Sequence, residues 1–203
     1  MKRSYINKTK LMKGNYKMIQ IRKGVFETNS SSTHSIAIPR NCTAPSCVYF
    51  REGEFGWEWD EVDAADYFYT AIYDTSETAA ELEEKLETLK DILNAHNIEF
   101  TFYDVDFEEH NGWLSHDGYI DHGYELKEFV DELLNDGDKL VRFLGGGLVF
   151  TGNDNSDTEE RCFIERTEEY LDKYDWESKT TSKIKNPYYM SDWDNYEWHY
   201  KGN

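Results

Sequence analysis

A leucine ladder between residues 76 and 96 is the strongest constraint on the fold of this chain. Ala79, Leu82, Leu86, Leu89 and Leu93 recur at spacings of three and four residues, the period of one face of an α-helix. The opposite face is acidic and carries Glu81, Glu83, Glu84, Glu87 and Asp91. The stretch 74–77, Asp-Thr-Ser-Glu, has the residue types of a helix start. We therefore expect a long amphipathic helix that opens there and buries its leucines.

The other segments mix helical and strand patterns. Apolar spacings predict helices over 62–72 and 126–134, the second ending at the Asn-Asp-Gly of 135–137. Strands are expected over 19–26, 34–38 and 98–102, and as a hairpin of 140–144 and 148–151 across three glycines. Residues 40–60 and 104–123 read as loops, and 158–173 as a helix or strand. This order predicts an α+β fold, a mixed, mainly antiparallel sheet covered by about three helices.

Length and composition predict the domain organisation. A chain of 203 residues fits one domain, and its aromatic content of 16% can supply a core. Residues 1–17 carry six basic residues and no acid, so they are expected to form a flexible basic extension. We expect a single α+β domain over 18–173. The remainder, 174–203, is rich in aromatic residues and is expected to pack on the domain or on a partner.

The formal net charge is −19, which disfavours direct binding of DNA by the acidic body. Two interpretations remain: a solvated acidic surface, or a surface that occupies the basic groove of a nucleic-acid-binding protein. The acidic residues that we expect to meet such a partner are Glu58, Asp60, Glu61, Asp63, Asp66, Glu81, Glu83, Glu84 and Glu87. No apolar run approaches the length of a membrane span, and three cysteines without a signal segment favour reduced thiols in a cytoplasmic protein.

Residues 27–35 form a dense polar stretch between two expected strands. Their hydroxyls and N–H groups can cradle a phosphate, with Asn29, Ser30, Ser31, Ser32 and Thr33 as the ligand-binding candidates. Glu27 can act as a base or hold a metal, and His34 can act as an acid or base. The alternative is an ordinary turn, in which His34 is a buried core residue because it shares a strand face with Ile36 and Ile38. Both interpretations stay open.

Two further segments carry polar clusters. His110, His116 and His122 are spaced by six residues, which matches no standard zinc pattern, and only the adjacent pair Asp121-His122 is retained as a candidate. The stretch 151–157 contains Asn153, Asp154 and Asn155 and begins like a calcium loop, but the glycine and glutamate that such a loop needs are missing. An Asx-rich turn is the alternative there.

The stretch 22–35, Arg-Lys-Gly-Val-Phe-Glu-Thr-Asn-Ser-Ser-Ser-Thr-His-Ser, resembles the opening of a group of small proteins from phages and mobile elements of bacteria. Members of that group also carry segments similar to 118–122 and 151–155, in the same order. The resemblance covers about 19–157. Its setting implies proteins that counter host defence, including inhibitors of CRISPR nucleases.

The resemblance implies that the three polar segments converge on one pocket. The catalytic candidates are Glu27, His34, Asp121, His122 and Asp154, and Asn153 and Asn155 join the ligand-binding candidates. The implied function is inhibition of a host defence protein, a Cas nuclease or its guide-RNA complex, by the acidic surface. The alternative is a small enzyme acting on a nucleotide or RNA phosphate, with a divalent metal on Glu27, Asp121 and Asp154 and with His34 or His122 moving the proton. A structural phage protein, with the polar segments as turns, is a third hypothesis.

Overall fold

The computed structural model describes residues 32–56, 60–110, 113–121, 125–153, 168–186 and 189–201. The basic extension over 1–17 and the strand expected at 19–26 lie outside these residues. So do several of the candidate site residues, namely Glu27, Asn29, Ser30, Ser31, Glu58, His122, Asp154 and Asn155.

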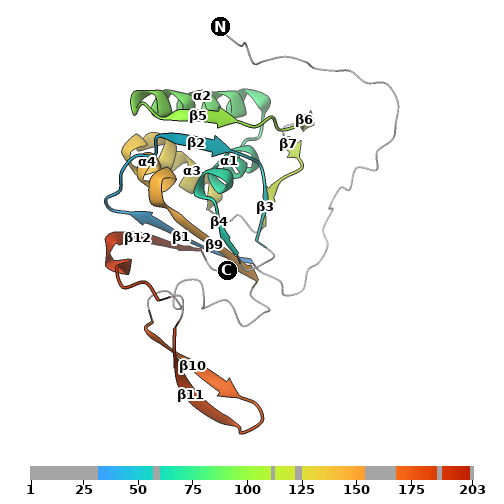
Figure 1. Cartoon of the computed structure of the whole chain (residues 1–203). Coiled ribbons are helices and arrows are strands. Elements are labelled where there is room, and N and C mark those ends of the chain that lie inside the picture. Colours follow the sequence, from blue (N-terminus) through green and yellow to red (C-terminus); the bar gives the residue numbers. More distant parts are fainter. Residues whose placement is uncertain are drawn as a thin grey trace.

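A four-stranded sheet forms the base of the fold. Its order is β12 (Tyr196–Lys201), β1 (Ser32–Pro39), β9 (Leu148–Asn153), β4 (Asp60–Val62), and every neighbouring pair is antiparallel. The strand predicted at 34–38 is confirmed as β1 and ends at Pro39, as expected. Figure 1 shows the helices stacked on one side of this sheet. The predicted α+β class is therefore confirmed.

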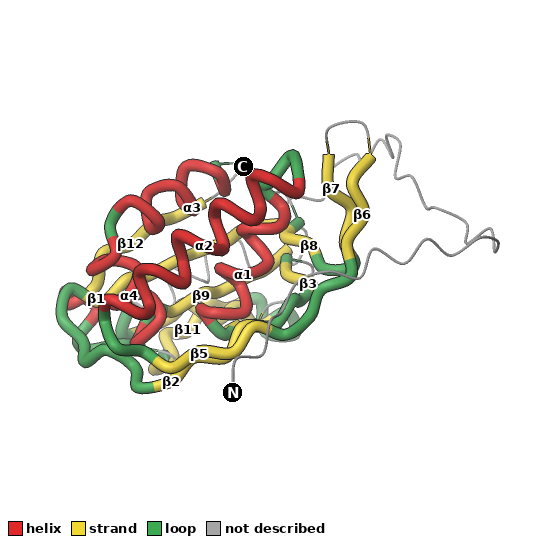
Figure 2. Tube along the Cα trace, turned by 90° about the horizontal axis from the view of Figure 1, so that it is seen from above, coloured by secondary structure: helices red, strands yellow, loops and turns green. Residues whose placement is uncertain are grey.

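The helix α1 (Ala64–Asp74) lies between the sheet and α2 (Ala79–Ala95), as Figure 1 shows. The Asp63 carboxylate opens α1 by accepting hydrogen bonds from the N–H groups of Ala65 and Asp66. Every residue from Tyr67 to Tyr73 is buried, because α1 is covered on all sides. Two shorter helices, α3 (Leu126–Asn135) and α4 (Gly137–Gly146), complete the layer. Seen from above, α2 crosses over α1 (Figure 2).

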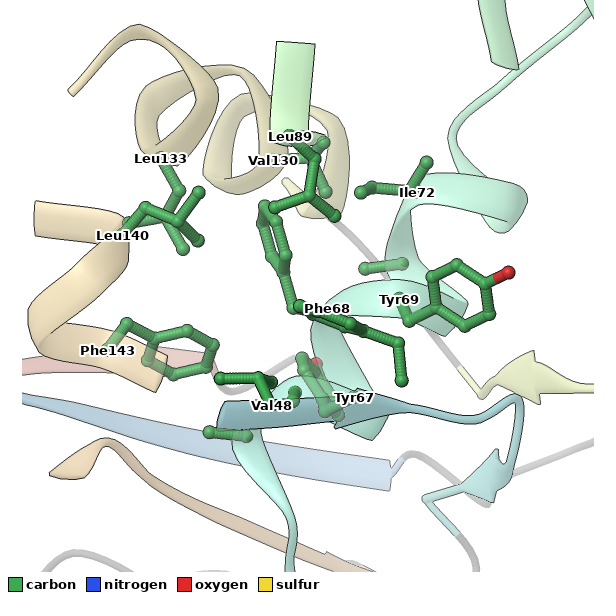
Figure 3. Packing of buried hydrophobic residues seen from close by; sticks show 14 of the residues in the cluster. Val48, Tyr67, Phe68, Tyr69, Ile72, Leu89, Val130, Leu133, Leu140 and Phe143 are labelled. Carbon is green, nitrogen blue, oxygen red and sulfur yellow. The ribbon is translucent and has the colours of Figure 1, made fainter. Parts of the chain in front are cut away.

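The hydrophobic core sits where the helices meet the sheet. Phe68 of α1 packs edge-on against Phe129 of α3 and Phe143 of α4, with each ring-centroid distance at 6.2 Å. Leu89 reaches this cluster from α2, and Figure 3 shows it above Phe68. The leucine ladder therefore faces inward, as its period predicts.

The start of α2 differs from the prediction. Thr78 caps the helix and accepts a hydrogen bond from the Glu81 N–H, so α2 begins at Ala79. The hydroxyls of Thr75 and Ser76 instead donate to carbonyl oxygens of Ala71 and Ile72. These two residues close α1 and do not open α2, because a hydroxyl can satisfy either end of a helix.

The strand predicted at 140–144 is wrong, since these residues belong to α4. The Asp136 carboxylate accepts a hydrogen bond from the Lys139 N–H and so starts a helix there. Leu140 and Phe143 lie on its buried face. A short apolar run does not distinguish a strand from one side of a helix.

The loops expected over 40–60 and 104–123 contain short strands. Two pairs are parallel: β2 (Cys47–Phe50) with β5 (Glu99–Phe102), and β3 (Glu54–Phe55) with β8 (Tyr119–Ile120). The third pair is the hairpin of β6 (Phe107–His110) and β7 (Trp113–His116). Strands of two to four residues are too short to show an alternating pattern.

The C-terminal part contains a second hairpin and the last strand of the sheet. The hairpin of β10 (Tyr170–Asp175) and β11 (Thr180–Lys185) projects from the sheet on the side away from α2 (Figure 1). The chain then passes through a short 3-10 helix, η2 (Trp193–Asn195), and returns as β12 to pair with β1.

Candidate functional site

Parts of the three polar segments meet at one end of β1. The register of β1 and β9 sets Ser32 opposite Asn153 and Thr33 opposite Gly152. His34 Nε2 donates a hydrogen bond to the carbonyl oxygen of Asp121, at 2.9 Å. Segments from distant parts of the sequence are thus neighbours in space. For Ser32, Thr33 and Asn153 the structure describes the backbone alone.

His34 is fully buried in this arrangement. Its Nδ1 lies 3.2 Å from the hydroxyl of Tyr67, which is also fully buried. Because the Asp121 carbonyl can only accept, Nε2 carries the proton and the Tyr67 hydroxyl donates to Nδ1. Burial, followed by the charge of Asp74, raises the pKa of Tyr67, so the phenol stays a donor. This geometry favours the core interpretation of His34 over direct contact with a substrate.

A second polar cluster, which the sequence does not predict, surrounds His116. Its Nδ1 donates to Glu52 Oε1, and its Nε2 lies 3.0 Å from Asp74 Oδ1. The same two carboxylates also accept hydrogen bonds from the N–H groups of Gly118 and Ile120, at 2.7 and 2.6 Å. The cluster therefore ties β7 and β8 to the end of α1 and to the segment between β2 and β3.

The cluster sets two carboxylates, Glu52 and Asp74, around one imidazole ring. Burial on its own lowers the pKa of His116, but the hydrogen bonds and negative charges of Asp74 and Glu52 outweigh it and hold the pKa above its ordinary value. Both ring nitrogens face acceptors, so the imidazolium is the form that the site favours. Gly118 is needed beside it, because an added Cβ would lie 2.2 Å from Glu52 Cγ and 2.7 Å from the Gly53 oxygen. The arrangement suits a structural cation better than a group that exchanges protons with a substrate.

The evenly spaced histidines do not share a site as far as the structure describes them. His110 pairs with Glu108 on the exposed β6–β7 hairpin, whereas His116 is enclosed by Glu52 and Asp74. Among the described residues, no group of three or more His, Cys, Asp or Glu side chains is arranged to hold a metal ion.

The predicted partner-binding acids divide into two groups. Some serve the fold: Asp63 caps α1, Asp66 accepts from the Arg51 N–H, and Glu81 pairs with the nearly buried Lys85 at 3.0 Å. Others are exposed on the outer side of α2. We call Glu83, Glu84 and Glu87, together with the exposed Asp91 of the same helix, which was not among the predicted acids, the acidic face. Glu61 is exposed on β4, and Asp60 is described by its backbone alone.

The acidic face borders a shallow groove between α2 and α3. The groove has a volume of about 260 Å³ and is lined by Glu81, Glu84, Lys85, Thr88, Asp131, Leu134 and Asn135. Glu87 pairs with Lys90 at 2.9 Å, but this ion pair is exposed and contributes little to the stability of the fold. At the start of α2, Glu109 of β6 accepts a hydrogen bond from the Ala79 N–H. The β6–β7 hairpin thus adds one carboxylate, that of Glu109, at the start of α2.

No family model, curated protein or solved structure matches this chain. Within the described residues, no helix combines the length and the apolar character needed to cross a membrane.

Proposed function

We propose that this chain is an inhibitor encoded by a phage or mobile element, and that it binds a nucleic-acid-handling defence protein in the host cytoplasm. Its acidic face would occupy a cationic groove of that partner, a Cas nuclease or its guide-RNA complex. The observation that carries the proposal is the exposure of Glu83, Glu84, Glu87 and Asp91 along one side of a well-anchored helix. The net charge of −19 supports it.

The charge spacing of the acidic face is close to that of a nucleic-acid strand. From Glu83 to Asp91 the helix axis rises by about 12 Å in steps of about 1.5, 4.5 and 6 Å, so the mean rise between successive carboxylates is about 4 Å. Each strand of a DNA duplex carries a phosphate about every 3.4 Å along the helix axis. Lys85 does not interrupt this face, because its ammonium group is held inside by the Thr75 carbonyl and Glu81. A groove built for phosphates would therefore meet a comparable density of negative charge.

Charge-neutral variants of the acidic face test the proposal. We expect Glu83→Gln together with Glu84→Gln to slow association with a Cas nuclease about tenfold at low salt, because steering depends on these charges. Surface plasmon resonance at low and high salt measures the effect. The matched control is Asp192→Asn with Asp194→Asn, which removes the same charge from exposed residues near β12, far from α2 (Figure 1). Equal effects of the two pairs, or binding that is unaffected by salt, would refute the proposal.

The meeting of Ser32, Thr33, Asp121 and Asn153 at one end of β1 favours a second candidate function, an enzyme acting on a nucleotide or RNA phosphate. Under this proposal Glu27, Asp121 and Asp154 would hold a divalent metal ion, and small hydroxyls would bind the phosphate. RNA cleavage with and without Mg²⁺ is the assay. Activity that disappears in folded Glu27→Gln and Asp154→Asn variants would support this function. Unchanged biological activity of both variants would rule it out.

A further inference from the structure

The β10–β11 hairpin displays its side chains to solvent on both faces. From Tyr170 to Lys185 every residue except Leu171 is exposed, and Trp176 at the turn is 83% exposed. A two-stranded hairpin without a covering layer is only marginally stable in water. Large aromatic side chains on such an element therefore need a reason other than packing in the core.

One face of this hairpin combines aromatic rings with lysines. The register sets Tyr170 opposite Lys185, Asp172 opposite Lys183, and Tyr174 opposite Thr181, so these side chains share a face. Trp176 joins them at the turn, where its ring packs edge-on against Tyr174 with centroids 4.8 Å apart. We call Tyr170, Tyr174 and Trp176, with Lys183 and Lys185, the aromatic face. The other face carries Lys173 opposite Ser182 and Leu171 opposite Ile184.

The charge of the hairpin differs from that of the rest of the chain. Between Tyr170 and Lys185 four lysines stand against three acidic residues, while the whole chain has a net charge of −19. Six-residue strands extend about 20 Å. Because the Debye length is about 8 Å at physiological salt, the turn is largely screened from the acidic body. It also projects on the side away from the acidic face (Figure 1).

From these observations we propose that the aromatic face binds single-stranded nucleic acid. Bases would stack on Trp176, Tyr174 and Tyr170, and Lys183 and Lys185 would contact phosphates, which is the chemistry of stacking platforms on β-surfaces. Asp172 opposes binding, because it lies among these groups and pairs with Lys183 at 3.9 Å. Affinity is therefore weak, with a Kd of about 10⁻⁴ M at physiological salt. The proposal does not depend on the proposed function.

Fluorescence anisotropy of the full chain with labelled single-stranded RNA and DNA of about 12 nucleotides tests this binding. We expect Trp176→Ala to weaken binding about tenfold, because stacking of one base is lost and this exposed side chain supports little of the fold. Lys183→Ala should weaken binding severalfold, whereas Lys173→Ala on the opposite face should change it less than about twofold. Asp172→Asn should strengthen it, since it removes a negative charge and leaves the lysines.

Three results would overturn the proposal. The first is no binding of either probe at about 10⁻⁴ M protein and low salt. The second is equal loss in Lys183→Ala and Lys173→Ala, which would show attraction without a defined face. The third is self-association in sedimentation velocity runs without nucleic acid that Trp176→Ala abolishes, which would assign the aromatic face to a second copy of the chain. Each result leaves the test of the acidic face unaffected, because that test uses another partner and other residues.

Discussion

Replacing His116 with alanine is expected to lower the free energy of unfolding by about 3 kcal/mol. The substitution removes a nearly buried cation and leaves the carboxylates of Glu52 and Asp74 facing each other across the space. It also weakens the attachment of β7 and β8, because these carboxylates hold the N–H groups of Gly118 and Ile120. Urea denaturation at neutral pH, followed by circular dichroism, measures the effect.

The same substitution should show a defined pH dependence. The pKa of His116 is raised in the folded state, so its contribution is fully present below the unfolded pKa of about 6.5 and is lost as the pH rises through the folded value. The difference in unfolding free energy between the wild type and His116→Ala should therefore shrink as the pH rises above about 6.5. His110→Ala serves as the control, because this histidine pairs with Glu108 on an exposed hairpin. A difference for His116 that is constant or that grows with pH would contradict the account of this cluster.

Replacing His34 with alanine is the other change with a large expected effect, again a loss of about 3 kcal/mol. A cavity would open in the core at a fully buried position, and the hydrogen bonds to Tyr67 and to the Asp121 carbonyl would be lost. Tyr67→Phe, which removes only the hydroxyl, should cost about 1 kcal/mol. Thermal and urea unfolding of both variants would test this order.

The outcome for His34 also separates its two interpretations. A structural histidine predicts that His34→Ala loses stability and that biological activity falls only with the folded fraction. Unchanged stability together with complete loss of activity would show that His34 is a functional group.

The regular spacing of apolar residues along the sequence predicted most of the fold that could be predicted. The leucines of α2 and the alternation of His34, Ile36 and Ile38 in β1 recur over enough residues to fix both the element and its buried face. The strand predicted at 140–144 was wrong because its apolar residues fit a strand and one side of a helix equally well. The Asp136 side chain caps the helix there, which favours α4 over a strand. The strands β3 and β8 have two residues each, which is too few to show an alternation of apolar and polar residues.

The polar interior could be predicted only in part. The segments around His34, Asp121 and Asn153 are neighbours, but their convergence on one pocket stays a prediction. The burial of His34 is indicated in the sequence only by its alternation with isoleucines. The catalytic and ligand-binding roles assigned to these segments stay predictions. The sequence did not predict the cluster of Glu52, Asp74 and His116, because its members come from three separate parts of the chain and form no motif. The sequence of 74–77 even indicated a helix start, although the Asp74 carboxylate serves His116 and Ile120.

The buried cluster and the acidic face are connected through the β6–β7 hairpin. His116 fixes β7 to the end of α1, β7 pairs with β6, and Glu109 of β6 accepts the Ala79 N–H at the start of α2. A carboxylate at a helix N-terminus is favourable, because it meets the positive end of the helix dipole. Loss of His116 should therefore disturb the start of α2 as well as the hairpin.

Competition between this chain and nucleic acid for one groove tests the central claim most directly. A labelled guide RNA is titrated into a Cas nuclease at rising concentrations of the chain, at low and at high salt. The account predicts that the apparent Kd for the RNA rises linearly with the concentration of the chain, and that Glu83→Gln with Glu84→Gln weakens this competition. Unchanged affinity for the RNA, together with unchanged binding of target DNA by the ternary complex, would contradict the claim that the acidic face of α2 takes the place of phosphates.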